Sequence, residues 1–108
     1  MSLTEELVHW TNEQKCRKAV TSLEQHGFTA AYMSTPQEAF DYIVSQAKDA
    51  VSIGFGGSMS VASLGVEAAL RDQGMEILNH SRHDLPMEQR LEIMRRQLTC
   101  DLFLSGCN

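Results

Sequence analysis

The sequence predicts an α/β protein with three layers, in which helices cover both faces of a mostly parallel sheet of about four strands. Short apolar runs alternate with longer segments of helical periodicity, and this alternation is typical of parallel strands joined by right-handed crossovers. Residues 50–54 are apolar apart from Ser52. A run of this kind is typical of a strand that is covered on both faces.

The N-terminal segment is predicted to be helical but not uniform. Two apolar stripes with helical spacing are separated by a polar segment, in which Thr11 and Gln14 match a capping box. We therefore expect a helix over about 12–26, closed by Gly27. A loosely attached helical arm, residues 1–11, would precede it.

The remainder of the chain is predicted to alternate strands with helices, without an internal repeat or a low-complexity linker. We expect strands at 28–33, 50–54, 75–79 and from 100 onward, and helices at 36–48, 60–73 and 85–98. Gly65 lies inside the second of these helices and weakens it by roughly 1 kcal/mol relative to Ala. Close packing against a strand would explain a glycine at that position.

A glycine-serine segment after the strand at 50–54 is the main candidate for ligand binding. It contains Gly54, Gly56, Gly57, Ser58 and Ser60. Glycine permits positive φ and close approach of a ligand to the backbone, and Ser60 is the expected N-cap of the next helix. Free N–H groups at a helix start favour a phosphate or carboxylate. An ordinary strand–helix turn needs the same residue types, and the P-loop lysine and the dinucleotide spacing are both absent, so both interpretations stay open.

Parallel α/β sheets bind ligands beyond the carboxyl ends of their strands. This rule places three loops, residues 54–60, 80–84 and 105–108, along one edge and makes them the predicted site. Arg82 in the second loop is suited to a substrate carboxylate, with simple surface solvation as the alternative. Asn108 in the third loop completes the predicted ligand-binding residues.

The residues indicate no set of catalytic groups. His80 and His83 are three positions apart and have no third ligand, so we expect no metal, and no other cofactor is indicated. Glu67 is interpreted as an ordinary residue of a helix surface rather than a nucleophile. Cys107 has no histidine placed beside it by the sequence. Catalytic residues are therefore unassigned, and whether the protein is an enzyme stays open.

Composition narrows the classes of partner. The chain has 108 residues, a net charge of −5 and no basic stripe, which argues against nucleic acid. No apolar stretch reaches the length of a membrane span. The 3 cysteines are widely spaced and indicate free thiols in a reducing compartment. We therefore expect one cytoplasmic domain, residues 1–108, without a nucleic-acid or membrane partner.

Three motifs together resemble the LUD domain, the lactate-utilisation family that includes LutC/YkgG-type proteins. They are SIGFGGSMS at 52–60, the Leu-Gly pair at 64–65 and DLFLSGCN at 101–108. The resemblance runs from about residue 27 to the end and implies a fold similar to the NagB/RpiA/CoA-transferase-like group. It also implies a small anionic ligand (a phosphate, CoA ester or carboxylate) and iron–sulfur partner subunits of a lactate-oxidation system.

A full LUD domain continues past the asparagine that matches Asn108, so the resemblance implies that this chain is the N-terminal part of such a domain. A partial sheet leaves an open edge, and we expect a homo-oligomer that covers it. Two functions follow. One is metabolite binding in lactate or organic-acid utilisation, and the other is a non-catalytic assembly or regulatory module that docks partner proteins.

Overall fold

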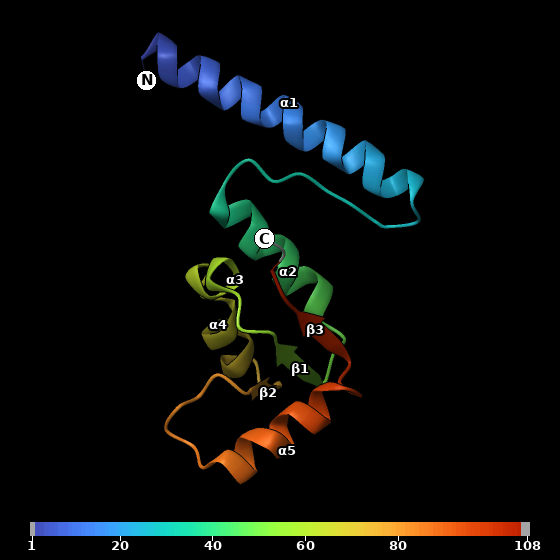
Figure 1. Ribbon diagram of the computed structural model, residues 1–108, viewed down its shortest axis with the longest axis vertical. Helices are drawn as coiled ribbons and strands as arrows, with labels where there is room; N and C mark the ends of the chain where they lie inside the picture. Colours follow the sequence, from blue (N-terminus) through green and yellow to red (C-terminus); the bar gives the residue numbers. More distant parts are fainter. Residues whose placement is uncertain (1, 107–108) are drawn as a thin grey trace. The chain divides into compact units, whose positions relative to one another are not determined.

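A computed structural model describes residues 2–106 and divides the chain into two compact units, Met1–Thr35 and Pro36–Asn108. The elements are labelled in chain order in Figure 1. They are α1 (Leu3–Gln25), α2 (Pro36–Ala47), β1 (Ser52–Phe55), α3 (Met59–Ser63), α4 (Val66–Asp72), β2 (Glu76–Asn79), α5 (Met87–Gln97) and β3 (Leu102–Leu104). No helix among the described residues is long and apolar enough to cross a membrane.

The first unit is built on α1, one unbroken helix rather than an arm followed by a shorter helix. It starts with a capping box in which the Ser2 hydroxyl accepts a hydrogen bond from the Glu5 N–H at 3.1 Å. The Glu5 carboxylate in turn accepts one from the Ser2 N–H at 3.0 Å. The predicted capping box at Thr11 is wrong, because the Thr11 hydroxyl donates to the Leu7 carbonyl at 2.8 Å inside the helix.

The strand expected at 28–33 is also wrong. This segment is extended but joins no sheet, and Phe28 at its start is 62% exposed. Two consecutive alanines make it a weak strand former, and an extended segment without a neighbouring strand gains no ladder hydrogen bonds. The Arg17 guanidinium of α1 instead lies 5.7 Å from the centroid of the Tyr32 ring, a cation–π distance.

The second unit contains a parallel sheet in the order β2-β1-β3. Phe55 of the central strand is paired with Asn79 of β2 and with Leu104 of β3. The carboxyl ends of all three strands therefore meet at one edge. The parallel α/β class is confirmed, with three strands in place of the four expected.

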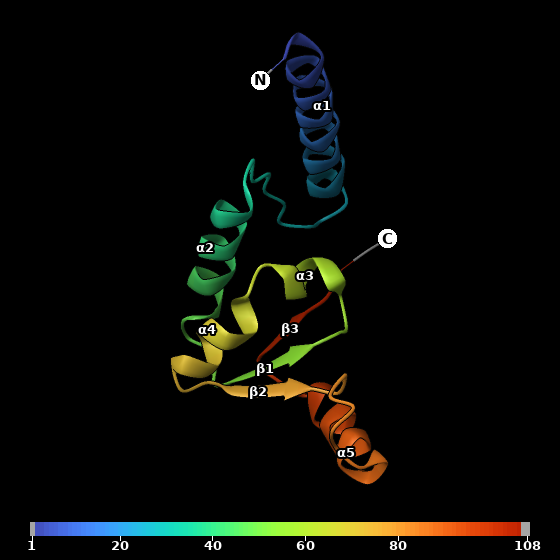
Figure 2. The same cartoon turned by 90° about the vertical axis from the view of Figure 1, so that its left-hand side faces the viewer.

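Helices cover both faces of this sheet. In Figure 2, α2, α3 and α4 lie on one side of the strands and α5 on the other. Ile53 and Phe55 point to the first side, where they form the core with α2 and α4. The fully buried side chains of this core include Ile53, Val66 and Leu70. Gly54 points to the opposite face, and a Cβ placed there would lie 3.1 Å from the Gln97 side chain at the end of α5.

The helix expected at 60–73 is divided into α3 and α4. Gly65 between them has a φ of +76° and is the N-cap of α4. No atom lies within 4 Å of the position that a Cβ would take at Gly65, so close packing is not the reason for the glycine. The left-handed backbone is the reason. The expected N-cap at Ser60 is likewise wrong, because Ser58 caps α3.

Candidate functional site

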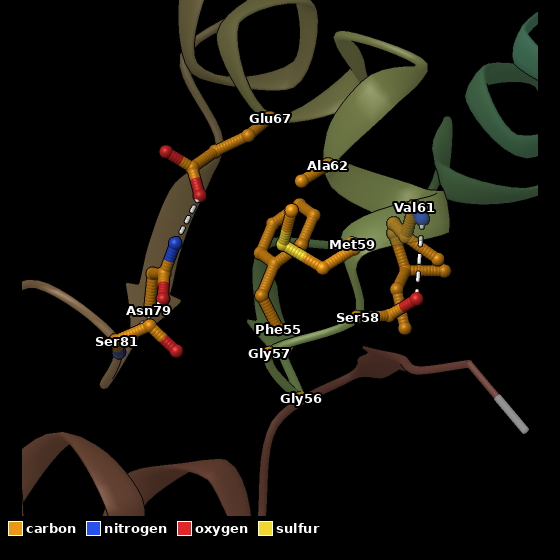
Figure 3. Close-up of a pocket in the computed structure, with 11 residues that line it drawn as sticks. Phe55, Gly56, Gly57, Ser58, Met59, Val61, Ala62, Glu67, Asn79 and Ser81 are labelled. Atoms are coloured by element: carbon orange, nitrogen blue, oxygen red, sulfur yellow. Dashed lines mark hydrogen bonds between the residues drawn. The ribbon is translucent and has the colours of Figure 1, made fainter. Parts of the chain in front are cut away.

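A pocket of about 330 Å³ opens at the carboxyl edge of the sheet. Figure 3 shows the side chains around it. Its lining comes from the end of β1 with the glycine loop, α3, the start of α4, the segment after β2 and the end of β3. These residues are Phe55, Gly56, Gly57, Ser58, Met59, Val61, Ala62, Glu67, Asn79, Ser81 and Leu104.

The glycine loop is held at the end of β1 by backbone hydrogen bonds. The Gly56 N–H donates to the Leu104 carbonyl at 2.9 Å, which ties the loop to β3. Gly57 then takes a φ of +78°, a conformation that favours glycine. The N–H groups of residues 57–60 donate no hydrogen bond within the described part of the chain. Among residues 2–106 they have no acceptor.

Ser58 connects the loop to α3. Its hydroxyl oxygen accepts a hydrogen bond from the Val61 N–H at 3.2 Å. Because α3 ends at Ser63, the helix behind the loop has only 5 residues. The helix dipole that the sequence led us to expect is correspondingly small, since fewer peptide dipoles are aligned. What the loop offers an anion is its own set of backbone N–H groups.

A chain of polar side chains forms the opposite wall of the pocket. The Asn79 side-chain nitrogen donates a hydrogen bond to Glu67 Oε1, and Asn79 Oδ1 accepts one from the Ser81 N–H at 2.9 Å. The second oxygen of the Glu67 carboxylate accepts from Arg71 Nη2, also at 2.9 Å. Figure 3 shows Glu67, Asn79 and Ser81 on the same side of the pocket.

The floor and remaining walls of the pocket are apolar. Phe55, the last residue of β1, is 6% exposed and belongs to the core. Val61 and Leu104 pack against the same core. Met59 is 85% exposed at the rim. The pocket thus has the glycine loop on one side, polar side chains on the other and a carbon surface between them.

Gln97 supports the floor of the pocket from the opposite face of the sheet. Its side-chain nitrogen donates to the carbonyls of Phe55 at 3.0 Å and Leu78 at 2.7 Å. These carbonyls lie at the ends of β1 and β2, so one amide from α5 joins the two strands where the pocket begins. Gln97 Oε1 lies 3.2 Å from His80 Nδ1, which holds the start of the next loop.

The structure places the predicted site residues in different surroundings. Gly56, Gly57 and Ser58 line the pocket, whereas Gly54 and Ser60 do not. Gly54 lies under α5, where a Cβ would come within 2.8 Å of the Phe103 ring. Asn108 lies outside the described residues.

Arg82 lies outside the pocket lining and is paired with a neighbour in its own loop. Its guanidinium donates to both Asp84 carboxylate oxygens, at 3.2 Å and 2.6 Å. The hydrogen bonds from Arg82 lower the pKa of the Asp84 carboxyl, and the same contact raises the pKa of Arg82. Both side chains are exposed, so this ion pair is solvated.

Sequence reasoning missed the polar wall. Glu67 was expected to be an ordinary surface glutamate, but the structure places it in the pocket. Asn79 and Ser81 could have been predicted from the sequence. Asn79 is the last residue of a strand and Ser81 lies just after it, and the carboxyl end of this strand was expected at the ligand-binding edge. No group of three or more His, Cys, Asp or Glu side chains in residues 2–106 is placed to hold a metal ion.

The parallel sheet and the pocket at its carboxyl edge define the class of α/β domains whose ligand sites lie beyond the strand ends. The family model of the LUD domain matches residues 16–108, and the chain therefore belongs to this family. This confirms the resemblance seen in the sequence and makes the chain a lactate-utilisation-related protein. Comparisons with curated proteins and with solved structures gave no significant match.

Proposed function

We propose that the pocket binds a small anionic metabolite in lactate or related organic-acid utilisation, with a phosphate or carboxylate at the glycine loop. The observation that carries this proposal is the run of N–H groups at residues 57–60, which have no acceptor within the described residues, and residues 57–59 of this run line the pocket. Successive backbone N–H groups in a turn form anion-binding concavities without a cationic side chain.

The volume of the pocket supports a small ligand. About 330 Å³ lies at the lower end of the range of about 300–1,000 Å³ that is usual for ligand pockets. Such a space suits a metabolite of a few carbon atoms, or the acyl end of a CoA ester whose remainder stays in solvent. Phe55, Val61 and Leu104 would contact the carbon skeleton, since they make up the apolar side of the pocket.

The charge of Glu67 is compatible with an anion in the same pocket. Its carboxylate is paired with Arg71 and also accepts a hydrogen bond from Asn79. An ion pair of this kind reduces the repulsion that a bare carboxylate would exert on the ligand. The anionic group would sit at the loop, on the opposite side of the pocket from Glu67.

A binding experiment tests the proposal by adding charge at the pocket. Ser81 lines the pocket, and its hydroxyl makes no hydrogen bond within the described residues, so Ser81→Asp adds a carboxylate with little loss of structure. We expect a ligand at 100 times its Kd to stabilise the wild-type fold by about 2.7 kcal/mol. In Ser81→Asp the affinity should fall about tenfold or more, because like charges repel at short range.

The matched control is Ser45→Asp, the same change at an exposed position of α2 outside the pocket. Thermal unfolding with sugar phosphates, acyl-CoA and short carboxylates measures both variants. Ser45→Asp should retain wild-type affinity. Equal affinity of Ser81→Asp and Ser45→Asp for every ligand that stabilises the wild type would contradict binding in this pocket.

A second candidate function is that of a non-catalytic assembly or regulatory module. Such a module would form homo-oligomers and dock iron–sulfur partner subunits in the cytoplasm. The observation that favours it is exposed apolar surface at the end of α5 and on β3. Leu98 is 84% exposed and Phe103 is 49% exposed. Under this candidate no anion shifts the unfolding temperature, whereas the first candidate requires such a shift.

A further inference from the structure

Of the described residues that line the pocket, one carries a charge, and this residue is Glu67. Asn79 holds one oxygen of its carboxylate and Arg71 holds the other. The Glu67 side chain retains 31% of its exposure, so a ligand can reach it. The carboxylate is therefore oriented from two sides, and each of its oxygens keeps a lone pair that could accept a further hydrogen bond.

The two polar walls of the pocket differ in what they offer a ligand. The loop at residues 57–60 has backbone N–H groups without an acceptor among the described residues, whereas the Glu67 carboxylate is an acceptor. Figure 3 shows Phe55 between Ser58 on one side and Glu67 with Asn79 on the other. A ligand that fills this space meets donors at one end, carbon in the middle and a carboxylate at the other end.

We propose that Glu67 makes the pocket selective for hydroxylated anions. The inference rests on the proposed function, in which the loop binds the anionic group of the ligand. The Glu67 carboxylate would then accept a hydrogen bond from a hydroxyl on the same carbon skeleton. An anion without a hydroxyl would place carbon against the carboxylate and displace its water without supplying a hydrogen-bond donor, which opposes binding.

A hydroxyl fits this position better than an ammonium group. Arg71 already pairs with the Glu67 carboxylate at 2.9 Å, so the local charge is balanced before a ligand enters. A neutral donor keeps this balance and adds a charge-assisted hydrogen bond. A hydrogen bond of this class contributes about ten- to hundredfold in affinity.

Matched ligands test the selectivity directly by titration calorimetry of the full chain. L-lactate, propionate and L-alanine share a three-carbon carboxylate and differ in bearing a hydroxyl, a hydrogen or an ammonium group. Glycerol 3-phosphate and propyl phosphate provide the same comparison for a phosphate and so distinguish the two sources of the anion. We expect the hydroxylated member of the preferred class to bind at least about tenfold more tightly than the others.

Glu67→Gln keeps the size of the side chain and removes its charge. The preference for the hydroxylated ligand should then fall toward one, because a neutral amide oxygen accepts a weaker hydrogen bond from the hydroxyl and loses less when the deoxy ligand leaves it without a donor. A purely structural role for Glu67 would weaken both ligands together and leave their ratio unchanged. Glu92→Gln is the matched control, since it removes an exposed glutamate paired with Arg95 outside the pocket and should preserve the wild-type ratio.

The outcomes separate this inference from the proposed function. Equal affinities within each ligand set, tighter binding of L-alanine, or an unchanged ratio in Glu67→Gln would overturn the role of Glu67 while leaving anion binding intact. Binding by none of these anions would overturn both. If Glu67→Gln does not fold, Glu67→Asp retains the charge but withdraws it by one methylene. An unchanged ratio in that folded variant would also overturn the proposal.

Discussion

Asp101 joins the amino ends of β1 and β3. These ends lie at the edge of the sheet opposite the edge that carries the pocket. Its carboxylate accepts hydrogen bonds from the N–H groups of Val51 at 2.8 Å and Ser52 at 3.1 Å. The Asp101 N–H in turn donates to the Ser52 hydroxyl at 3.1 Å. The two backbone hydrogen bonds lower the pKa of Asp101, because they favour the charged form of the carboxyl.

Replacing this carboxylate should change how stability depends on pH. The folded pKa of Asp101 is below its unfolded value of about 3.9, so its contribution to stability is present above that value. The contribution is lost as the pH falls through the folded pKa. Asp101→Asn should therefore lower the urea midpoint at pH 7 and make the loss of stability below about pH 4 shallower.

The control for Asp101→Asn is Asp84→Asn, which removes another carboxyl with a lowered pKa. Asp84 pairs with Arg82 across an exposed loop and joins no separate strands. Its replacement should change the urea midpoint less than Asp101→Asn does. If the pH–stability curves of Asp101→Asn and the wild type superimpose, the hydrogen bonds to the Asp101 carboxylate do not stabilise the sheet.

A glycine motif in the sequence does not show whether each glycine is required for close packing or for its backbone conformation. Gly54 and Gly57 are equivalent in the sequence pattern, but a Cβ at Gly54 would press on Phe103 at 2.8 Å. Gly57 instead has a φ of +78° at the pocket. The sequence correctly indicated that the segment needs glycine. The sequence did not distinguish a packing requirement from a backbone requirement. This distinction depends on which residues of β3 and α5 lie against each glycine.

At the scale of elements, the break between α3 and α4 shapes the pocket wall. Gly65 adopts a φ of +76° with open space around it, so its backbone conformation is the constraint there. The chain turns at this residue, and Val66 and Leu70 become buried in the core. Glu67 lies on the same helix and faces the pocket. The position of Glu67 therefore depends on the break.

Substitutions at Gly65 separate backbone strain from packing. Gly65→Ala should destabilise the protein by about 1–2 kcal/mol, because an L-residue with a Cβ is strained in the left-handed region. Gly65→Asn should recover part of this loss, since asparagine tolerates that region better. Urea unfolding of both variants measures the difference. An alanine variant as stable as the wild type would indicate that residues 59–72 readily form one continuous helix.

Element boundaries were predictable where a local signal and the tertiary structure agree. Pro36 at the start of α2 and Gly74 after α4 are such signals, and the elements beside them lie close to their expected positions. The prediction failed at 28–33, where a local apolar pattern was taken for a strand without knowledge of a partner. It failed again at Gly65, because helical periodicity on both sides of the residue conceals a change of direction.

At the scale of the whole molecule, the core and the pocket both belong to the second unit, Pro36–Asn108. The expectation that the strands end at one edge is confirmed by the parallel pairing of β1 with β2 and β3. Of the three loops expected there, the glycine loop and Ser81 contribute to the pocket, and β3 contributes Leu104 rather than a described residue of 105–108. The contact between Glu67 and Asn79 was beyond the sequence, since it requires the register of α4 after the break. The function proposed for the glycine loop thus depends on a sheet edge that the sequence predicted and on a polar wall that it did not predict.

Binding of an anion to the backbone N–H groups of the glycine loop can be tested residue by residue. The most direct measurement is an NMR titration of the ¹⁵N-labelled chain with glycerol 3-phosphate, L-lactate and acetyl-CoA, following each amide resonance. We expect saturable shifts for the amides of residues 57–60 and Ser81 with at least one of these ligands. Saturable shifts confined to other parts of the chain, or no shifts with any of the three, would contradict it.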